Sequence, residues 1–343
     1  METRPCVLTA CSVVRTQLAP MPLDVLSDVL RAIRLTGVVY FDFTLKPPWV
    51  AEAPPSREIA GTVLPGSERI IEYHLLLQGS AWGHAVGDEP IHLREGDLLL
   101  FPQGDAHVLS STPGMRSAPD LSMYARSSTP LPLVYELGTS NDGGRTRLIC
   151  GFFGCDERPY NPLLTALPAL IHLPAAATDV IARPLGAMLE IAIREERRGQ
   201  PGTDNVLSRL SELMLVEAIR RYLVELPDTQ RSWLAGLRDP VVGRALEALH
   251  SAPREPWTVE SLGRTIGVSR SVLAARFTDM VGHPPMNYLT LWRMQLASRM
   301  LRDGQQVIDV AGAVGYESEA AFSRAFKKLM GTPPVQWRRR SPS

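Results

Sequence analysis

The sequence of 343 residues has few cysteines, no long apolar run and no net charge. Four cysteines are too few for a disulfide scaffold in a chain of this length, so a reducing cytoplasm is the expected location. No stretch reaches the roughly 20 consecutive apolar residues that a membrane helix requires. No long apolar run follows a basic start, as an export signal would need. We therefore expect a cytoplasmic protein with no membrane partner.

The absence of net charge is the sum of two opposite regions. The 36 basic and 36 acidic residues cancel, which by itself argues against a nucleic-acid partner. Residues 231–343, however, contain 14 Arg, 2 Lys and 9 Asp or Glu and carry a net charge of +7, whereas residues 1–230 carry −7. The basic C-terminal third is therefore compatible with DNA binding.

The pattern of apolar residues divides the chain into four segments. Residues 1–20 show no period and are predicted to be a loose extension; the pattern improves from Met21, and the sequence leaves open whether translation starts there. Residues 21–178 hold short apolar runs between glycine-containing turns, which is typical of a β-sandwich or barrel. Residues 179–230 and 231–343 carry apolar residues at helical spacing. The sequence thus predicts a multi-domain α+β protein: a β-barrel, a helical connector and an all-α domain.

The all-α segment contains an internal repeat. Five residues recur at a constant offset of 49: Phe277, Gly282, Pro284, Pro285 and Tyr288 return as Phe326, Gly331, Pro333, Pro334 and Trp337. Each copy is predicted to form a helix, a tight glycine turn and a second helix, capped by Thr or Ser. One copy would be compatible with any small helical protein. Two copies on a basic segment indicate a pair of helix-turn-helix units.

The second helix of each unit is expected to enter the major groove of DNA. The predicted DNA-binding residues are its outward N-terminal side chains and caps: Ser269, Arg270, Ser271, Ala274 and Ala275, then Ser318, Glu319, Ala320, Ser323, Arg324 and Lys327. Arg can bind guanine with two hydrogen bonds, and Lys neutralises phosphate. Arg324 could instead pair with Glu317 or Glu319. Residues 286–302 are predicted as one helix of about 26 Å, which could space the two reading helices over successive major grooves.

Residues 232–340 closely resemble the AraC/XylS-type DNA-binding domain of bacterial transcription regulators. The resemblance rests on GVSRSVLAARFTDMVGHPPMNYLTLWRMQLASRMLRDG and VIDVAGAVGYESEAAFSRAFKKLMGTPPVQW. It implies two helix-turn-helix subdomains that read adjacent major grooves of double-stranded promoter DNA, with RNA polymerase as a further candidate partner. The first reading helix departs from this pattern because Ala274 and Ala275 lack polar groups. Its readout would then rest on Arg270, Ser271 and methyl contacts.

A second patterned region lies in the β-rich segment. GDLLLFPQGDAH, which ends at His107, resembles the second motif of the cupins, and EYHLLLQG, which begins at Glu72, resembles half of their first motif. The two histidines that normally precede that glutamate would fall near residues 65–68, which are Pro, Gly, Ser and Glu. The usual set of three histidines and one carboxylate is incomplete. We therefore predict neither a resident metal nor another cofactor.

Residues 21–175 as a whole resemble the cupin-type sensor domain of a subgroup of these regulators. Together the two resemblances identify the chain as a member of the AraC/XylS family with a cupin-like barrel. They imply a sequence-specific regulator, not an enzyme, in which a small molecule or stress signal repositions the DNA-binding domain. Glu72, His74 and His107 are the candidate ligand-binding residues, since small barrels commonly enclose one ligand. The alternatives are a metal-dependent cupin enzyme with a helical appendage and a ligand-free interaction module.

Two further features of the sequence each allow more than one interpretation. Cys150 and Cys155 are either buried, inert side chains or redox-sensing thiols, and a four-cysteine zinc site would also need Cys6 and Cys11. Residues 204–226 carry an apolar stripe that packs either on the chain's own barrel or on a second subunit. The resemblance favours a second subunit and hence a homodimer.

Overall fold

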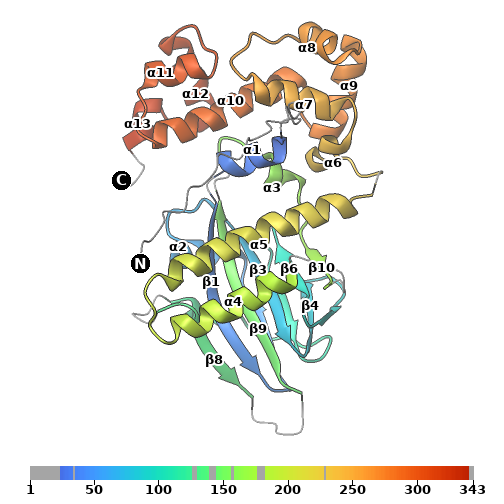
Figure 1. Cartoon of the computed structure of the whole chain (residues 1–343), viewed down its shortest axis with the longest axis vertical. Helices are drawn as coiled ribbons and strands as arrows, with labels where there is room; N and C mark the ends of the chain where they lie inside the picture. Colours follow the sequence, from blue (N-terminus) through green and yellow to red (C-terminus); the bar gives the residue numbers. More distant parts are fainter. Residues whose placement is uncertain are drawn as a thin grey trace, which may run out of the picture.

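The computed structural model describes residues 24–33, 35–125, 130–138, 144–155, 158–175, 182–227 and 229–339. The expected extension at 1–20 lies outside these residues. Figure 1 shows a sheet-rich part, residues 24–225, below a helical head, residues 233–339. The predicted combination of a β-rich domain with an all-α domain is confirmed.

Ten described strands form two sheets. The six-stranded sheet has the order β10-β6-β3-β9-β1-β8 and the four-stranded sheet the order β2-β7-β4-β5. The strands of the first sheet are β1 (Thr36–Leu45), β3 (Arg69–Gln78), β6 (Leu98–Phe101), β8 (Leu133–Leu137), β9 (Thr146–Cys155) and β10 (Ile171–Leu173). Those of the second are β2 (Val50–Ala53), β4 (Ser80–Ala85), β5 (Ile91–Arg94) and β7 (His107–Ser110).

The barrel is open rather than closed. Among the described strands, the two sheets share no hydrogen-bonded ladder. The strands of the smaller sheet have four to six residues, whereas β1, β3 and β9 each have 10, so the smaller sheet covers only part of the larger one. The two sheets face each other and enclose a core that includes Leu76, Phe101 and Leu109.

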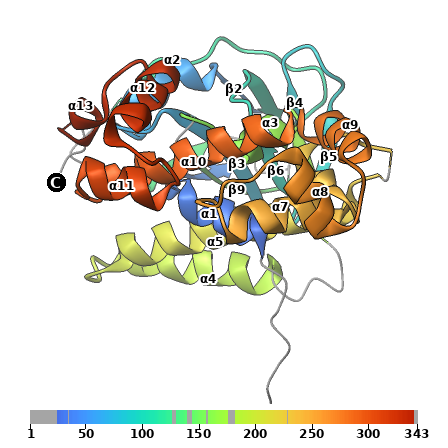
Figure 2. The same ribbon diagram turned by 90° about the horizontal axis from the view of Figure 1, so that it is seen from above.

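Both faces of the six-stranded sheet are buried. Side chains alternate along a strand, so Ile71 and Tyr73 point to one face of β3 while Glu72 and His74 point to the other. Ile71 and Tyr73 belong to the core under the helices, and Leu76 belongs to the core between the sheets. Figure 2 shows the resulting layers, with α4 and α5 on one side of the large sheet and the small sheet on the other.

Five α-helices among the described residues accompany the sheets: α1 (Val25–Ala32), α2 (Ser56–Val63), α3 (Pro162–Ala166), α4 (Ala182–Glu196) and α5 (Thr203–Glu225), with a short 3-10 turn at Leu121–Tyr124. A buried carboxylate, Asp42 of β1, pairs with Arg147 of β9 at 3.1 Å and with Arg197, just after α4, at 2.6 Å. This ion-pair network fastens α4 to the sheet.

The apolar stripe of α5 lies mainly on the chain's own sheet. Its buried members are Leu207, Met214, Leu215, Ala218 and Ile219. Leu213 and Val224, in contrast, are 50% and 77% exposed. Most of the stripe therefore packs within the chain, which agrees with the first of the two interpretations.

The head consists of eight described helices: α6 (Trp233–Arg238), α7 (Val242–Ser251), α8 (Val259–Ile266), α9 (Arg270–Val281), α10 (Pro285–Arg302), α11 (Val307–Ala313), α12 (Glu319–Met330) and α13 (Pro334–Arg339). The predicted caps are confirmed, since Thr258, Ser269 and Ser318 each accept a hydrogen bond from a backbone amide three residues on. The predicted long helix is α10. Among the described residues no helix is both long and apolar enough to cross a bilayer.

The two helix-turn-helix units have different cores. Leu273 and Phe277 of the first unit belong to the same continuous core as α1, α3 and one face of the large sheet. Phe322 and Phe326 of the second unit belong to a separate core closed by Trp337. The first unit is thus built onto the sheet-rich part, and the second is connected to it through α10.

We predict that the turn glycines of the two units differ in tolerance. Gly267 and Gly315 both have a positive φ, +74° and +81°, which costs a residue with a side chain roughly 1–2 kcal/mol. A Cβ at 267 would meet nothing within 4 Å, whereas one at 315 would lie 2.5 Å from the backbone oxygen of Arg254. Gly315→Ala should therefore lower the free energy of unfolding in urea at least twice as much as Gly267→Ala. Equal losses would contradict this packing.

Candidate DNA-reading surface and sensor cavity

The predicted reading residues lie on the surface of the head. Most of them are exposed, and only Ala274 and Ser323 are half-buried. They occupy the N-terminal halves of α9 and α12 or the cap preceding each helix, apart from Lys327 in the last turn of α12. The structure therefore leaves these side chains accessible, and their contact with DNA stays a prediction.

The two arginines of this surface differ in their ion pairs. Arg270 forms an exposed ion pair with Glu260 of α8 at 2.7 Å. Such surface pairs contribute little free energy, so Arg270 can exchange this partner for DNA. Arg324 is exposed and has no ion-pair partner among the described residues, so pairing with Glu317 or Glu319 is not observed.

The first reading helix is positioned by an ion pair that the sequence did not predict. Arg276 of α9 donates to both oxygens of the Asp239 carboxylate, from Nε to Oδ1 at 3.0 Å and from Nη2 to Oδ2 at 2.5 Å. Burial opposes ionisation of Asp239, but hydrogen bonds from Arg276 and from two backbone amides outweigh it and lower its pKa. A bidentate contact of this kind fixes orientation. No local pattern links these two residues, which are 37 positions apart.

A cavity of about 200 Å³ lies between the two sheets. Its wall is largely aromatic and aliphatic and also contains a few polar side chains, a composition typical of small-molecule sites. The aromatic members are Phe41, Phe43, Trp49, Tyr124 and Phe152, and the polar members include Glu72, His74 and His107. The structure thus brings the three predicted ligand-binding residues together.

These three side chains are buried and close to one another. Nε2 of His74 lies 2.7 Å from Nε2 of His107, which in turn lies 3.7 Å from Oε2 of Glu72. Burial raises the pKa of Glu72 to about 8, despite a hydrogen bond from Ser56, and lowers the pKa of His107 to about 4. Burial also holds the pKa of His74 well below its usual value. Burial therefore favours the uncharged form of all three side chains.

Comparison with known proteins agrees with both parts of the molecule. The family model described as a cupin matches residues 24–224, and the model described as a helix-turn-helix domain matches residues 262–340. A protein of Streptomyces lividans described as an AraC-like transcription regulator is 36% identical over 274 residues, which are 79% of this chain and 87% of that protein. The chain belongs to the AraC family of transcription regulators, with an N-terminal cupin domain.

Two further HTH-type transcriptional regulators are similar over about the same share of the chain. The HTH-type transcriptional regulator AlkR of Acinetobacter baylyi is 33% identical over 78% of this chain and 87% of its own length. The RCS-specific HTH-type transcriptional activator RclR of Escherichia coli is 28% identical over 80% of this chain and 86% of its own length. The similarity in this AraC-family protein therefore spans both the sheet-rich part and the head.

A buried glutamine of α10 connects the two parts. Gln295 is 1% exposed. Its side-chain amide donates to the carbonyl of Ala32 at 3.1 Å, and its side-chain oxygen accepts from the backbone amide of Tyr160 at 3.4 Å. Nearby, Arg299 donates to the carbonyl of Arg31 at 2.7 Å. The helix that joins the two reading units is thus bonded to the ends of two segments of the sheet-rich part.

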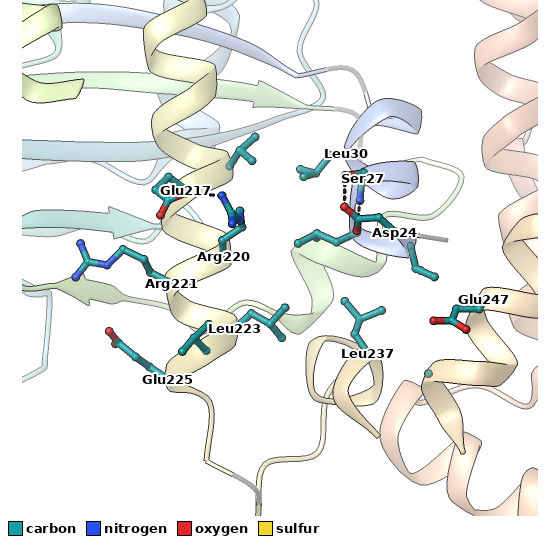
Figure 3. Close-up of a pocket in the computed structure, with 15 residues that line it drawn as sticks. Asp24, Ser27, Leu30, Glu217, Arg220, Arg221, Leu223, Glu225, Leu237 and Glu247 are labelled. Carbon is teal, nitrogen blue, oxygen red and sulfur yellow. Dashed lines mark hydrogen bonds and ion pairs between the residues drawn. The ribbon is translucent and has the colours of Figure 1, made fainter. Parts of the chain in front are cut away.

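A cleft of about 500 Å³ opens between α1, α5 and the first helices of the head. In Figure 3, Leu30 of α1, Leu223 of α5 and Leu237 of α6 border it, and Arg220 pairs with Glu217 along α5. The cleft separates the C-terminal half of α5 from α7. Direct contact between the two parts is therefore carried largely by α1 and α3.

The two described cysteines of this AraC-family regulator cannot form a disulfide with each other. Cys150 and Cys155 are five residues apart on β9, which places them about 17 Å apart along the strand and on opposite faces. A disulfide requires Cα atoms within about 7 Å. Cys150 lines the cavity, and burial raises the pKa of its thiol. Cys6 and Cys11 lie outside the described residues.

We predict that both of these thiols are unreactive in the folded protein. Cys150 and Cys155 should react with iodoacetamide at least about 100-fold more slowly in native protein than in guanidinium, because burial hides them and disfavours the thiolate. Peptide mass spectrometry would measure each rate, and a Ser271→Cys variant would provide an exposed thiol for comparison. Native labelling of Cys150 as fast as that of the exposed thiol would support thiol-based sensing instead.

Proposed function

We propose that this AraC-family regulator binds promoter DNA through both reading units and that a small, largely apolar effector in the cupin cavity changes the placement of the head. Membership of a family of transcription regulators supports this function and argues against a cupin enzyme. Its place of action is then the cytoplasm, where promoter DNA lies. RNA polymerase is a further candidate partner at the promoter.

One observation carries the proposed coupling: the strands that line the cavity lead directly to the residues that Gln295 binds. Strand β1, which contributes Phe41 to the cavity, begins four residues after Ala32. Strand β9, which contributes Phe152, ends five residues before Tyr160. A ligand that shifts either strand would therefore act on the backbone groups bonded to α10. Since α10 joins the two reading units, this changes where they are presented to DNA.

The two parts carry opposite net charges, which favours contact of DNA with the head alone. A net charge of +7 in residues 231–343 attracts phosphate, and −7 in residues 1–230 keeps the rest of the chain away from it. Binding through Lys and Arg releases counterions and weakens with salt. Contact with DNA is then confined to the head.

We further propose a homodimer formed through the outer surfaces of α4 and α5. Large apolar side chains remain exposed there: Met188, Ile191, Val206, Leu213 and Val224. Exposed apolar patches of this kind mark interaction surfaces. A two-fold dimer would place four reading helices on one promoter.

The first test addresses DNA reading by the second unit. Duplexes selected from genomic fragments by the purified protein would be used in fluorescence anisotropy titrations. Arg324→Ala should weaken binding to the selected duplex by roughly 5- to 100-fold, since one good base contact contributes about 1–3 kcal/mol. Arg57→Ala, an exposed arginine of α2, should have no effect. Equal affinities for wild type and Arg324→Ala would contradict the proposed role of Arg324, and absence of any salt-dependent binding would contradict the function.

The second test addresses the connection through Gln295. Gln295→Ala leaves the Ala32 carbonyl and the Tyr160 amide without their buried partner, which costs about 1–3 kcal/mol. We expect differential scanning calorimetry to show one cooperative transition for wild type and two for the variant, as the head separates from the sheet-rich part. Gln305→Ala, at an exposed glutamine after α10, should unfold like wild type. Identical profiles for the two variants would show that Gln295 does not hold the parts together.

A further inference from the structure

We propose that the first reading helix, α9, selects thymine through the apolar side chains of Val272 and Ala275. This inference rests on the proposed DNA binding and deepens it by naming the base that the first unit recognises. Val272 is not among the reading residues predicted from the sequence. The structure adds it because its side chain is 50% exposed near the start of α9.

The internal repeat makes the two reading helices comparable position by position. Helices α9 and α12 begin at Arg270 and Glu319, 49 residues apart, and each follows a serine whose hydroxyl caps it. Ala275 therefore occupies in α9 the position that Arg324 occupies in α12, and both side chains are exposed. The first unit thus presents a methyl group where the second presents a guanidinium.

Both arginines of α9 are paired with carboxylates of the head. Arg276 contacts both oxygens of Asp239, which fixes its orientation. Arg270 forms an ion pair with Glu260 at 2.7 Å and must leave this partner before it can bind a base. The exposed apolar side chains of α9 give up no such contact when they meet DNA.

Val272 and Ala275 lie on one face of α9, because residues three positions apart on a helix are neighbours. Both are exposed and together form a small apolar surface. The 5-methyl group of thymine is the apolar group that base edges present in the major groove, and small apolar side chains contact it. Such a surface offers no hydrogen bond to the other bases. Thymine is therefore the base that it fits.

The far ends of the two reading helices differ in charge. Lys327 and Lys328 of α12 stand at the positions of Thr278 and Asp279 in α9, and all four side chains are exposed. Asp279 pairs with Arg231 at 3.0 Å. Lysines attract phosphate, whereas an aspartate does not. Attraction to the DNA backbone is therefore weaker at α9, and apolar contact contributes a larger share of its binding.

The test measures the affinity of the full-length protein for a duplex selected from genomic fragments, in which each thymine is replaced in turn by uracil. Uracil differs from thymine only in lacking the 5-methyl group. We expect the replacement at one or two positions to weaken wild-type binding about fourfold, which is the effect of removing one methyl group from a buried apolar contact.

Substitutions in α9 assign these positions to the first unit. Val272→Ala should bind the unmodified duplex more weakly and lose most of the uracil effect, because both changes remove the same contact. Ala275→Arg should replace the preference for thymine by one for guanine, to which arginine donates two hydrogen bonds. Val335→Ala, the same change as Val272→Ala at an exposed valine of α13, should keep the full uracil effect.

Circular dichroism would establish that the variants are folded, which the exposure of both side chains favours. The proposal would be overturned if uracil had no effect at any thymine of the selected duplex. It would also be overturned if the uracil effect were unchanged in both Val272→Ala and Ala275→Arg. Salt-dependent binding of wild type to the unmodified duplex would in either case still support the proposed function, so the two claims fail separately.

Discussion

The buried amide of Gln295 is the contact on which the arrangement of the two parts depends. An amide in an apolar interior must have its hydrogen bonds satisfied, and here both of its ends are bonded to backbone groups of the sheet-rich part. These groups belong to Ala32 and Tyr160, which lie close to β1 and β9 in the chain. The direction of α10 relative to the sheet is therefore specified by a polar contact as well as by apolar packing.

The long strands of the large sheet contribute side chains to the cavity on one face and to the helices on the other. Strands β1, β3 and β9 present Phe41, Glu72 and Phe152 to the cavity and present apolar side chains such as Ile71 and Tyr73 to the helices behind. Close-packed interiors transmit displacement because they have little free volume. The cavity and the helices α4 and α5 are thus separated by the thickness of one sheet.

The two helix-turn-helix units and the helix between them were predictable from the sequence, whereas the contacts between the two parts were not. Helix caps at Thr258, Ser269 and Ser318 are local signals, and the helix expected at 286–302 differs from α10 by one residue. Such signals act within a few residues of the chain, so they can be recognised without knowing the tertiary structure. The repeat added the relation between the two units, because its constant offset required them to be structurally equivalent.

The site in the sheet-rich part was only partly predictable. The spacing of two residues places Glu72 and His74 on one face of β3, but the approach of His107 from β7 depends on how the two sheets pack, which no spacing in the sequence specifies. The bonds of Gln295 join residues 263 and 135 positions apart, and nothing in the local sequence indicates either partner. The open form of the barrel was not predicted either. It follows from the short strands of the second sheet.

If Gln295 sets the placement of the head, the distance between spin labels in the two parts must depend on it. Nitroxide labels at Asp88→Cys, in the β4–β5 turn, and Lys328→Cys, on α12, would report the distance by pulsed electron paramagnetic resonance. Cys6 and Cys11 would be replaced by Ser, and the labelled chain diluted into unlabelled protein. We expect one narrow distance distribution that broadens or shifts in Gln295→Ala. A broad distribution without the substitution, or the same narrow one with it, would show that Gln295 does not set the placement of the head.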